Sequence, residues 1–121
     1  MGATQRSGQH AEQLACDYLQ QQGLILITRN FRSRSGEIDL IMRQQDTIVF
    51  VEVRFRKAGA LVDGTQSISY QKQTRLIRTA QYYLQKERIG DMVPARIDVV
   101  SVTNSNNSYQ FEWLINAIEA G

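Results

Sequence analysis

Two apolar segments of the sequence each carry one acidic side chain. Asp39 lies within residues 36–41 (Gly-Glu-Ile-Asp-Leu-Ile), and Glu52 lies within residues 49–54 (Val-Phe-Val-Glu-Val-Arg). The apolar and β-branched residues of both segments predict strands. Charged side chains are rarely buried in such strands unless they are paired with another group or bound to an ion. These two acids are therefore the first candidates for chemistry.

The residues between the two segments predict a hairpin that brings the acids together. A tight turn at Gln45-Asp46 places Met42 opposite Val49 and Asp39 opposite Glu52. Directly opposed residues have Cβ atoms about 4.5–5.5 Å apart, so two carboxylates there repel each other and one is driven to bind a proton. A divalent cation between them removes that conflict. Mg²⁺ commonly takes one or two carboxylates together with waters and substrate phosphate.

A cation follows Glu52 at a spacing that keeps both on one face of the strand. Side chains alternate along a strand, so Glu52 shares a face with Arg54, and Asp39 shares one with Glu37. A metal ion lowers the pKa of a bound water, and a neighbouring cation stabilises the charge that develops on a scissile phosphate. The arrangement suits phosphodiester hydrolysis. The alternative is a structural ion-pair network, in which the same acids pair with Arg43, Arg54 or Arg56.

The rest of the chain predicts the elements that must position this hairpin. Apolar residues at helical spacing predict helices over residues 7–22, with Ser7 as the cap, and over residues 68–86. Strands are expected over residues 24–28, 38–42, 47–55, 96–102 and 109–114, and a loop over residues 57–66. The order α-β-β-β-α-β-β predicts an α/β fold with a mixed central sheet flanked by helices. A length of 121 residues predicts one domain, 1–121.

Composition excludes several classes of protein. Hydrophobic residues make up 42% and charged residues 21% of the chain, which is typical of a globular protein. The single cysteine excludes an internal disulfide, and together with the single histidine it excludes a Cys/His zinc site. No apolar run approaches about 18 residues, and the first residues lack the apolar core of a signal peptide. We therefore expect a cytoplasmic protein that does not enter a membrane, in which Cys16 is a small buried hydrophobe.

Basic residues are concentrated in the middle of the chain. Residues 29–88 hold twelve of the fourteen basic side chains but only six of the twelve acidic ones. Eleven of the fourteen are arginine, which suits bidentate contacts to phosphate. The expected partner is therefore a nucleic acid, contacted by Arg32, Arg56, Lys72, Arg75 and Arg78. The alternative is a solvated helix face with ordinary ion pairs. Three aromatic residues could stack on bases or pack within the protein: Phe31, Tyr70 and Tyr82.

The order of these residues resembles the PD-(D/E)XK nuclease superfamily, which has the restriction-endonuclease-like fold. The match consists of Asp39, followed by Glu52-Val53-Arg54, within the predicted α-β-β-β-α-β order. More narrowly, the chain resembles the YraN family of small bacterial proteins over residues 6–103. That likeness is carried by Ala11-Glu12, Gly23, Arg29-Asn30-Phe31-Arg32, residues 36–41 and 49–54, Lys72 and residues 96–100.

The resemblance implies a metal-dependent endonuclease that hydrolyses phosphodiester bonds in DNA, branched or damaged DNA included. Its cofactor would be Mg²⁺ or Mn²⁺, with Asp39 and Glu52 as the ligands. Glu12 matches an acid that related enzymes use as an extra ligand from the first helix, and Lys72 falls where they often place an auxiliary polar or basic residue. From its position alone, Glu12 could equally be an acid that favours the helix dipole.

Two positions depart from the motif that names the superfamily. Ile38 stands at the position of its proline, which is a common substitution, and Arg54 stands at the position of its lysine. Arginine stays protonated in proteins, so Arg54 can supply positive charge as a catalytic residue but cannot act as a general base.

Three functions therefore compete at the level of the sequence. The first is the metal-dependent endonuclease, and the second is a nucleic-acid-binding module on the same fold that has lost catalysis. The third is a protein-interaction module whose acids are structural. The oligomeric state is open, a homodimer included.

Overall fold

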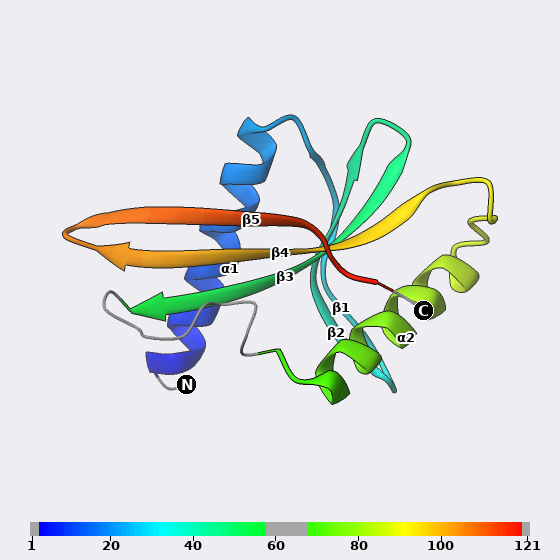
Figure 1. The fold of residues 1–121 in the computed structure, drawn as a ribbon, viewed down its shortest axis with the longest axis horizontal. Helices are drawn as coiled ribbons and strands as arrows, with labels where there is room; N and C mark the ends of the chain where they lie inside the picture. Colours follow the sequence, from blue (N-terminus) through cyan, green and yellow to red (C-terminus); the bar gives the residue numbers. More distant parts are fainter. Residues whose placement is uncertain (1–2, 58–67, 120–121) are drawn as a thin grey trace.

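A five-stranded sheet in the order β1-β2-β3-β4-β5 forms the centre of the protein (Figure 1). The computed structural model describes the backbone of residues 3–57 and 68–119, with side chains from residue 8 onward in these ranges. The strands are β1 (Ile25–Ser33), β2 (Gly36–Gln44), β3 (Thr47–Lys57), β4 (Ala95–Ser105) and β5 (Ser108–Ile118), and the helices are α1 (Ala3–Gln21) and α2 (Tyr70–Lys86). β3 and β4 are parallel, and the other neighbouring pairs are antiparallel. The predicted mixed sheet and order of elements are confirmed, and both are consistent with a restriction-endonuclease-like core.

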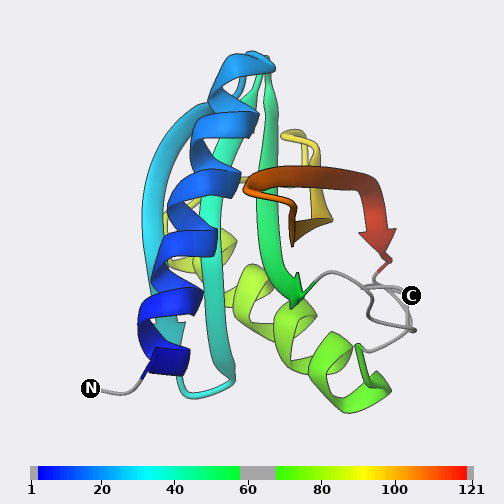
Figure 2. The same ribbon diagram turned by 90° about the vertical axis from the view of Figure 1, so that its left-hand side faces the viewer.

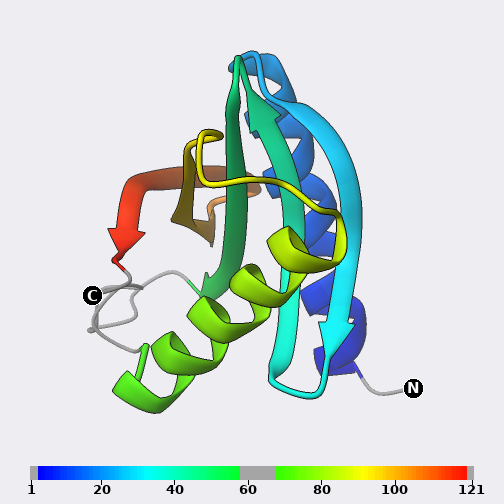
Figure 3. The same cartoon turned by 90° about the vertical axis from the view of Figure 1, so that its right-hand side faces the viewer.

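The two helices cover opposite faces of the sheet (Figures 2 and 3). α1 buries Ala15, Cys16 and Leu19 against one face, and α2 buries Leu76, Ala80 and Tyr83 against the other. The helical spacing of these residues gives each helix one apolar stripe, which is the feature that predicted them. Cys16 is fully buried, as expected for a small hydrophobe, and burial raises the pKa of its thiol. Within the described ranges, neither helix is long and apolar enough to cross a membrane.

The β2–β3 hairpin has the predicted turn and register. Gln44 pairs with Thr47 across a turn made by Gln45 and Asp46, and Gln45 has a φ of 54°. Met42 pairs with Val49, as predicted. The paired residues continue to Leu40 and Val51, one step before the two acids. The hairpin therefore delivers Asp39 and Glu52 to neighbouring positions.

α2 begins at a side-chain cap. The Ser69 hydroxyl accepts a hydrogen bond from the Lys72 backbone N–H at 3.1 Å, which satisfies one of the free donors of the first turn. The helix consequently starts at Tyr70, two residues after the predicted start at Ile68, whose side chain is buried in the core. The cap fixes the turn that carries Lys72.

All five strands and α1 are longer than the sequence predicted. β1 extends to Ser33 and β5 extends to Ile118, because edge strands carry exposed polar residues and lack the apolar runs that mark central strands. α1 begins at Ala3, so Ser7 lies within the helix and is not its cap. The loop predicted over residues 57–66 lies outside the described residues apart from Lys57, which ends β3.

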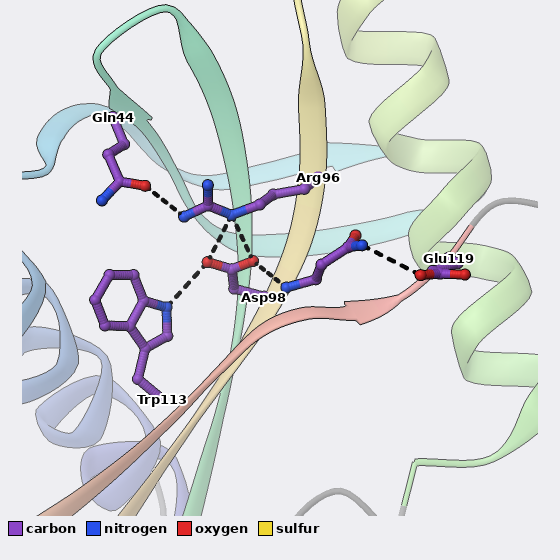
Figure 4. A network of polar contacts seen from close by, with 6 residues as sticks. Gln44, Arg96, Asp98, Trp113 and Glu119 are labelled. Carbon is purple, nitrogen blue, oxygen red and sulfur yellow. Dashed lines mark hydrogen bonds and ion pairs between the residues drawn. The ribbon is translucent and has the colours of Figure 1, made fainter.

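A buried carboxylate ties β4 to β5 (Figure 4). Asp98 is fully buried and accepts hydrogen bonds from Arg96 Nε at 2.9 Å, Trp113 Nε1 at 2.9 Å and the Asn116 backbone N–H at 2.8 Å. Arg96 also donates to the Gln44 side chain of β2 at 2.8 Å. The pairing of β4 with β5 shifts register between Ile97 and Val99, and the Asp98 carboxylate lies at that irregularity. Asp98 is thus a structural residue.

Candidate active site

Asp39 and Glu52 meet directly beyond the paired part of the β2–β3 hairpin. Asp39 Oδ2 accepts a hydrogen bond from the Val53 backbone N–H at 2.8 Å, so a side chain takes up a donor of the neighbouring strand. Glu52 is only 3% exposed. Both acids line a small pocket of about 150 Å³, which we call the carboxylate pocket, together with Gly36, Glu37, Lys72, Arg75 and Leu76. Residues of β2, β3 and α2 therefore converge on one cavity.

The two carboxylates share a proton when no cation lies between them. Burial and the charge of Glu52 raise the pKa of Asp39 to about 8, against an ordinary value of 3.8, although the Val53 N–H opposes the shift. In its neutral form Asp39 donates a hydrogen bond to Glu52, which raises that pKa further. At neutral pH the pair therefore carries one negative charge and one proton, as expected for two close acids.

Lys72 supplies the nearest cation to Glu52. Its Nζ lies 2.5 Å from Glu52 Oε2, whereas the Arg54 Nη1 lies 4.0 Å from the same oxygen. Arg54 shares the strand face of Glu52, as predicted, but Lys72 is the one of the two that lines the carboxylate pocket. The first turn of α2 thus supplies an amine beside Glu52, whereas the strand position of the motif lysine carries Arg54 in this chain.

Glu12 approaches the pair from α1. Burial, and after it the charge of Glu37, raises the pKa of Glu12, while a hydrogen bond with Asp39 lowers it. The Asn30 amide nitrogen donates to Glu12 Oε1 at 3.0 Å and to Glu37 Oε1 at 3.2 Å, in the amide orientation that satisfies both neighbours. Asn30 therefore links two acids around Asp39. No role was predicted for Asn30 from the sequence, although it lies in the segment Arg29-Asn30-Phe31-Arg32 that carries the family likeness.

Gly36 allows β2 to lie close against α2 at the edge of the carboxylate pocket. Its φ is +153°, and a Cβ placed there would lie 3.3 Å from Thr79 Oγ1 and 3.5 Å from Arg75 Cβ. A side chain at this position would meet both backbone strain and tight contacts. Glycine therefore sets the distance between β2 and the basic side of α2.

The carboxylate oxygen atoms of the carboxylate pocket suit a magnesium ion held by two protein ligands. Asp39 and Glu52 offer hard oxygen atoms, and the proton that they share marks a position where a cation would relieve their repulsion. Among the described residues no group of three or more His, Cys, Asp or Glu side chains has the spacing to hold a metal ion. Glu12 is near Asp39 but does not complete such a group. Any ion there would take its remaining ligands from water and substrate.

The predicted nucleic-acid contacts lie on three elements, α2, β1 and β3. Lys72 and Arg75 line the carboxylate pocket, and Arg78 is exposed on the same helix. Arg32 is exposed on β1, where its Nε lies 3.5 Å from Glu37 Oε1. Arg56 is half-buried on β3, where it pairs in the sheet with Thr103.

A protein-family model matches most of this chain. The model is described as uncharacterised protein family UPF0102, and it matches residues 11–102. The chain belongs to the UPF0102 family. UPF0102 is the YraN family whose likeness the sequence indicated. The matched range includes Glu12, Asp39, Glu52 and Lys72.

Relatives in the UPF0102 family are similar over nearly their whole length. A UPF0102 protein of Coxiella burnetii is 47% identical over 116 residues, covering 96% of this chain and 94% of the relative. A UPF0102 protein of Marinobacter nauticus is 46% identical over 118 residues, covering 97% and 95%. One of Legionella pneumophila is 45% identical over 118 residues, covering 98% of both chains. The names of these relatives state no reaction.

Proposed function

We propose that this UPF0102 protein is a divalent-metal-dependent endonuclease that hydrolyses phosphodiester bonds in DNA, branched or damaged DNA included. The observation that carries the proposal is the convergence of Asp39 and the buried Glu52 on one small pocket whose other charged members are Lys72, Arg75 and Glu37. Two close carboxylates destabilise each other, so retaining them in the core needs a compensating function. Loading with Mg²⁺ or Mn²⁺ supplies that compensation.

Each residue of the carboxylate pocket has a distinct part in this proposal. Asp39 and Glu52 would hold the ion, which supplies a water of lowered pKa and offsets charge on the scissile phosphate. The Val53 N–H holds the Asp39 carboxylate in place. Lys72, already in contact with Glu52, places a positive charge beside the phosphate in the role that the motif lysine has in related nucleases. Arg75 is exposed at the pocket and can hold a phosphate through two parallel hydrogen bonds.

Cleavage assays with matched variants test the proposal. The DNA substrates are a plasmid, a linear single strand, a flap and a four-way junction, each incubated with the protein and Mg²⁺ or Mn²⁺. Asp39→Ala and Glu52→Ala are compared with the control Asp46→Ala, which removes an exposed acid of the β2–β3 turn. We expect cleavage by the wild type and by Asp46→Ala, and none by the two pocket variants, with circular dichroism showing all four folded. Cleavage that survives both pocket substitutions would refute the assignment of the site.

A second candidate function has its own support. Lys72 already forms an ion pair with Glu52, and Arg54 occupies the position of the motif lysine. These features favour a nucleic-acid-binding module that no longer cleaves. It predicts salt-sensitive DNA binding with no cleavage under any metal, and gain of cleavage on Arg54→Lys would support an inactivated site.

A further inference from the structure

A second pocket lies beside the turn between β1 and β2. It has a volume of about 290 Å³ and is lined by Arg32, Ser33, Arg34, Ser35, Tyr82 and Lys86. We call it the Tyr82 pocket. Its size is at the lower end of the range of about 300–1,000 Å³ typical of small-ligand pockets, so it suits one nucleotide and not several.

The charge of the Tyr82 pocket favours an anion. Its lining contains three basic side chains and no acidic one, and all three bases are exposed. The nearest acid is Glu37, which pairs with Arg32 at 3.5 Å, but both side chains are well exposed and such pairs are weak. The guanidinium groups of Arg32 and Arg34 and the ammonium of Lys86 remain able to contact phosphate.

An exposed aromatic ring stands among these cations. Tyr82 is 46% exposed, although it lies on α2 next to the buried Tyr83. Phe31 stacks on it with ring centroids 6.2 Å apart, and Phe31 itself packs edge-on against Tyr83 at 5.1 Å. The Lys86 Nζ lies 5.6 Å from the centre of the Phe31 ring. The Tyr82 ring is thus supported from the protein side and open toward solvent, as in proteins that stack the bases of single strands.

The Tyr82 pocket lies along the same helix as the carboxylate pocket. Arg75 lines the first pocket and Tyr82 the second, with the close approach of Gly36 to Thr79 between them. Seven residues of α-helix span about 10 Å, which is the rise of about three stacked nucleotides. One nucleic-acid strand can therefore occupy both pockets.

We propose that the Tyr82 pocket binds an unpaired nucleotide of a single-stranded nucleic acid. The Tyr82 ring stacks on the base, and Arg32, Arg34 and Lys86 contact the neighbouring phosphates. The inference rests on the proposed function and deepens it by giving its substrate a single-stranded segment about three nucleotides from the cleavage position. The binding itself needs no catalysis.

Fluorescence anisotropy in EDTA tests the binding without cleavage. Labelled single-stranded and duplex oligonucleotides of equal length are titrated with the wild type, Tyr82→Ala, Tyr82→Phe and the control Tyr109→Ala, which removes a tyrosine of similar exposure (36%) on β5. We expect Tyr82→Ala to weaken single-strand binding about 5- to 150-fold, with duplex binding changed less than about twofold. Tyr82→Phe and Tyr109→Ala should bind as the wild type does. A single-stranded RNA arm tells whether the pocket accepts ribose as well as deoxyribose.

The charged part of the pocket is tested by the salt dependence of the same binding. Neutralising one side chain that binds a phosphate of a single strand reduces the slope of log K against log salt by about 0.7, so Arg32→Gln with Arg34→Gln should reduce it by about 1.4. Any of three results would overturn the inference. Tyr82→Ala could leave the single-strand affinity unchanged, or it could weaken duplex and single-strand binding equally. Tyr82→Phe could also lose as much single-strand affinity as Tyr82→Ala. If that happens while Asp39-dependent cleavage persists, only this inference fails. If cleavage is absent while Tyr82-dependent binding remains, only the proposed nuclease fails.

Discussion

Binding of a divalent ion by Asp39 and Glu52 is expected to release a proton. Because Asp39 has a pKa of about 8 in the metal-free protein, the ion must displace the proton that the pair shares. About 0.9 proton should leave per ion bound at pH 7, and the apparent affinity should fall about 50-fold between pH 8 and pH 6. That factor corresponds to about 2.3 kcal/mol at 25 °C.

Isothermal titration calorimetry with Mg²⁺ at pH 6, 7 and 8 measures both quantities. Titrations in two buffers of different ionisation enthalpy give the number of protons released. Asp46→Asn, which changes an exposed turn residue, should reproduce the wild-type behaviour, whereas Asp39→Asn should lose the binding. An affinity that stays constant from pH 6 to pH 8, with no proton released, would refute the reasoning from the shared proton.

The same shift predicts how the stability of the metal-free protein depends on pH. The folded state holds the Asp39 proton up to a pKa of about 8, whereas the unfolded chain loses it near 3.8. The folded state therefore binds more protons between these values, and the contribution of Asp39 to stability falls as the pH rises through that window. The difference in stability between wild type and Asp39→Asn, measured by urea unfolding from pH 4 to pH 8, isolates this contribution. A difference that does not change over this range would contradict it.

Three further substitutions and one control, Gly8→Ala, probe the surroundings of the pocket and the core. Lys72→Met removes the ammonium that contacts Glu52 and would compete with the metal ion for that carboxylate. We therefore expect tighter Mg²⁺ binding by calorimetry but cleavage at least about 10-fold slower. Unchanged or weaker Mg²⁺ binding would contradict this competition. Gly36→Ala should destabilise the fold by about 1–3 kcal/mol through strain and crowding, whereas Gly8→Ala, in open space on α1, should stabilise it by up to about 1 kcal/mol, both measured by urea unfolding. Asp98→Asn should lower the free energy of unfolding by about 3 kcal/mol, because it leaves Arg96 without its charge partner. Unfolding is followed by the fluorescence of the single tryptophan, and a midpoint equal to that of the wild type would disprove this expectation.

Glu52 has an amine beside it although the strand position that carries the motif lysine is an arginine. Arg54 Nη1 lies 4.0 Å from Glu52 Oε2, so its charge stays near that carboxylate even though it cannot lose a proton. Lys72 comes from a different element and contacts the same carboxylate oxygen at 2.5 Å. The helix therefore supplies the amine that the strand lacks.

The sequence by itself predicted the hairpin and its two acids. Alternation along a strand has a period of two residues, and a tight turn at Gln45-Asp46 then fixes which residues are opposed. Both features are local, so they can be read without knowing the rest of the fold. The apolar stripes of the two helices are local in the same way, which is why the order of the elements was also predicted. The edge strands were too short in the prediction because solvent on one side removes their apolar pattern.

The tertiary structure decided which groups complete the site. Lys72 reaches Glu52 only because α2, which follows β3 in the chain, packs against β2. Asn30 reaches Glu12 only because α1 packs beside β1. Such contacts join residues far apart in sequence, and their distances depend on how the helices are seated on the sheet. The raised pKa of Asp39 has the same origin, since burial is its largest cause. Residue types and spacing thus determined which groups are present, and packing determined their distances and charges.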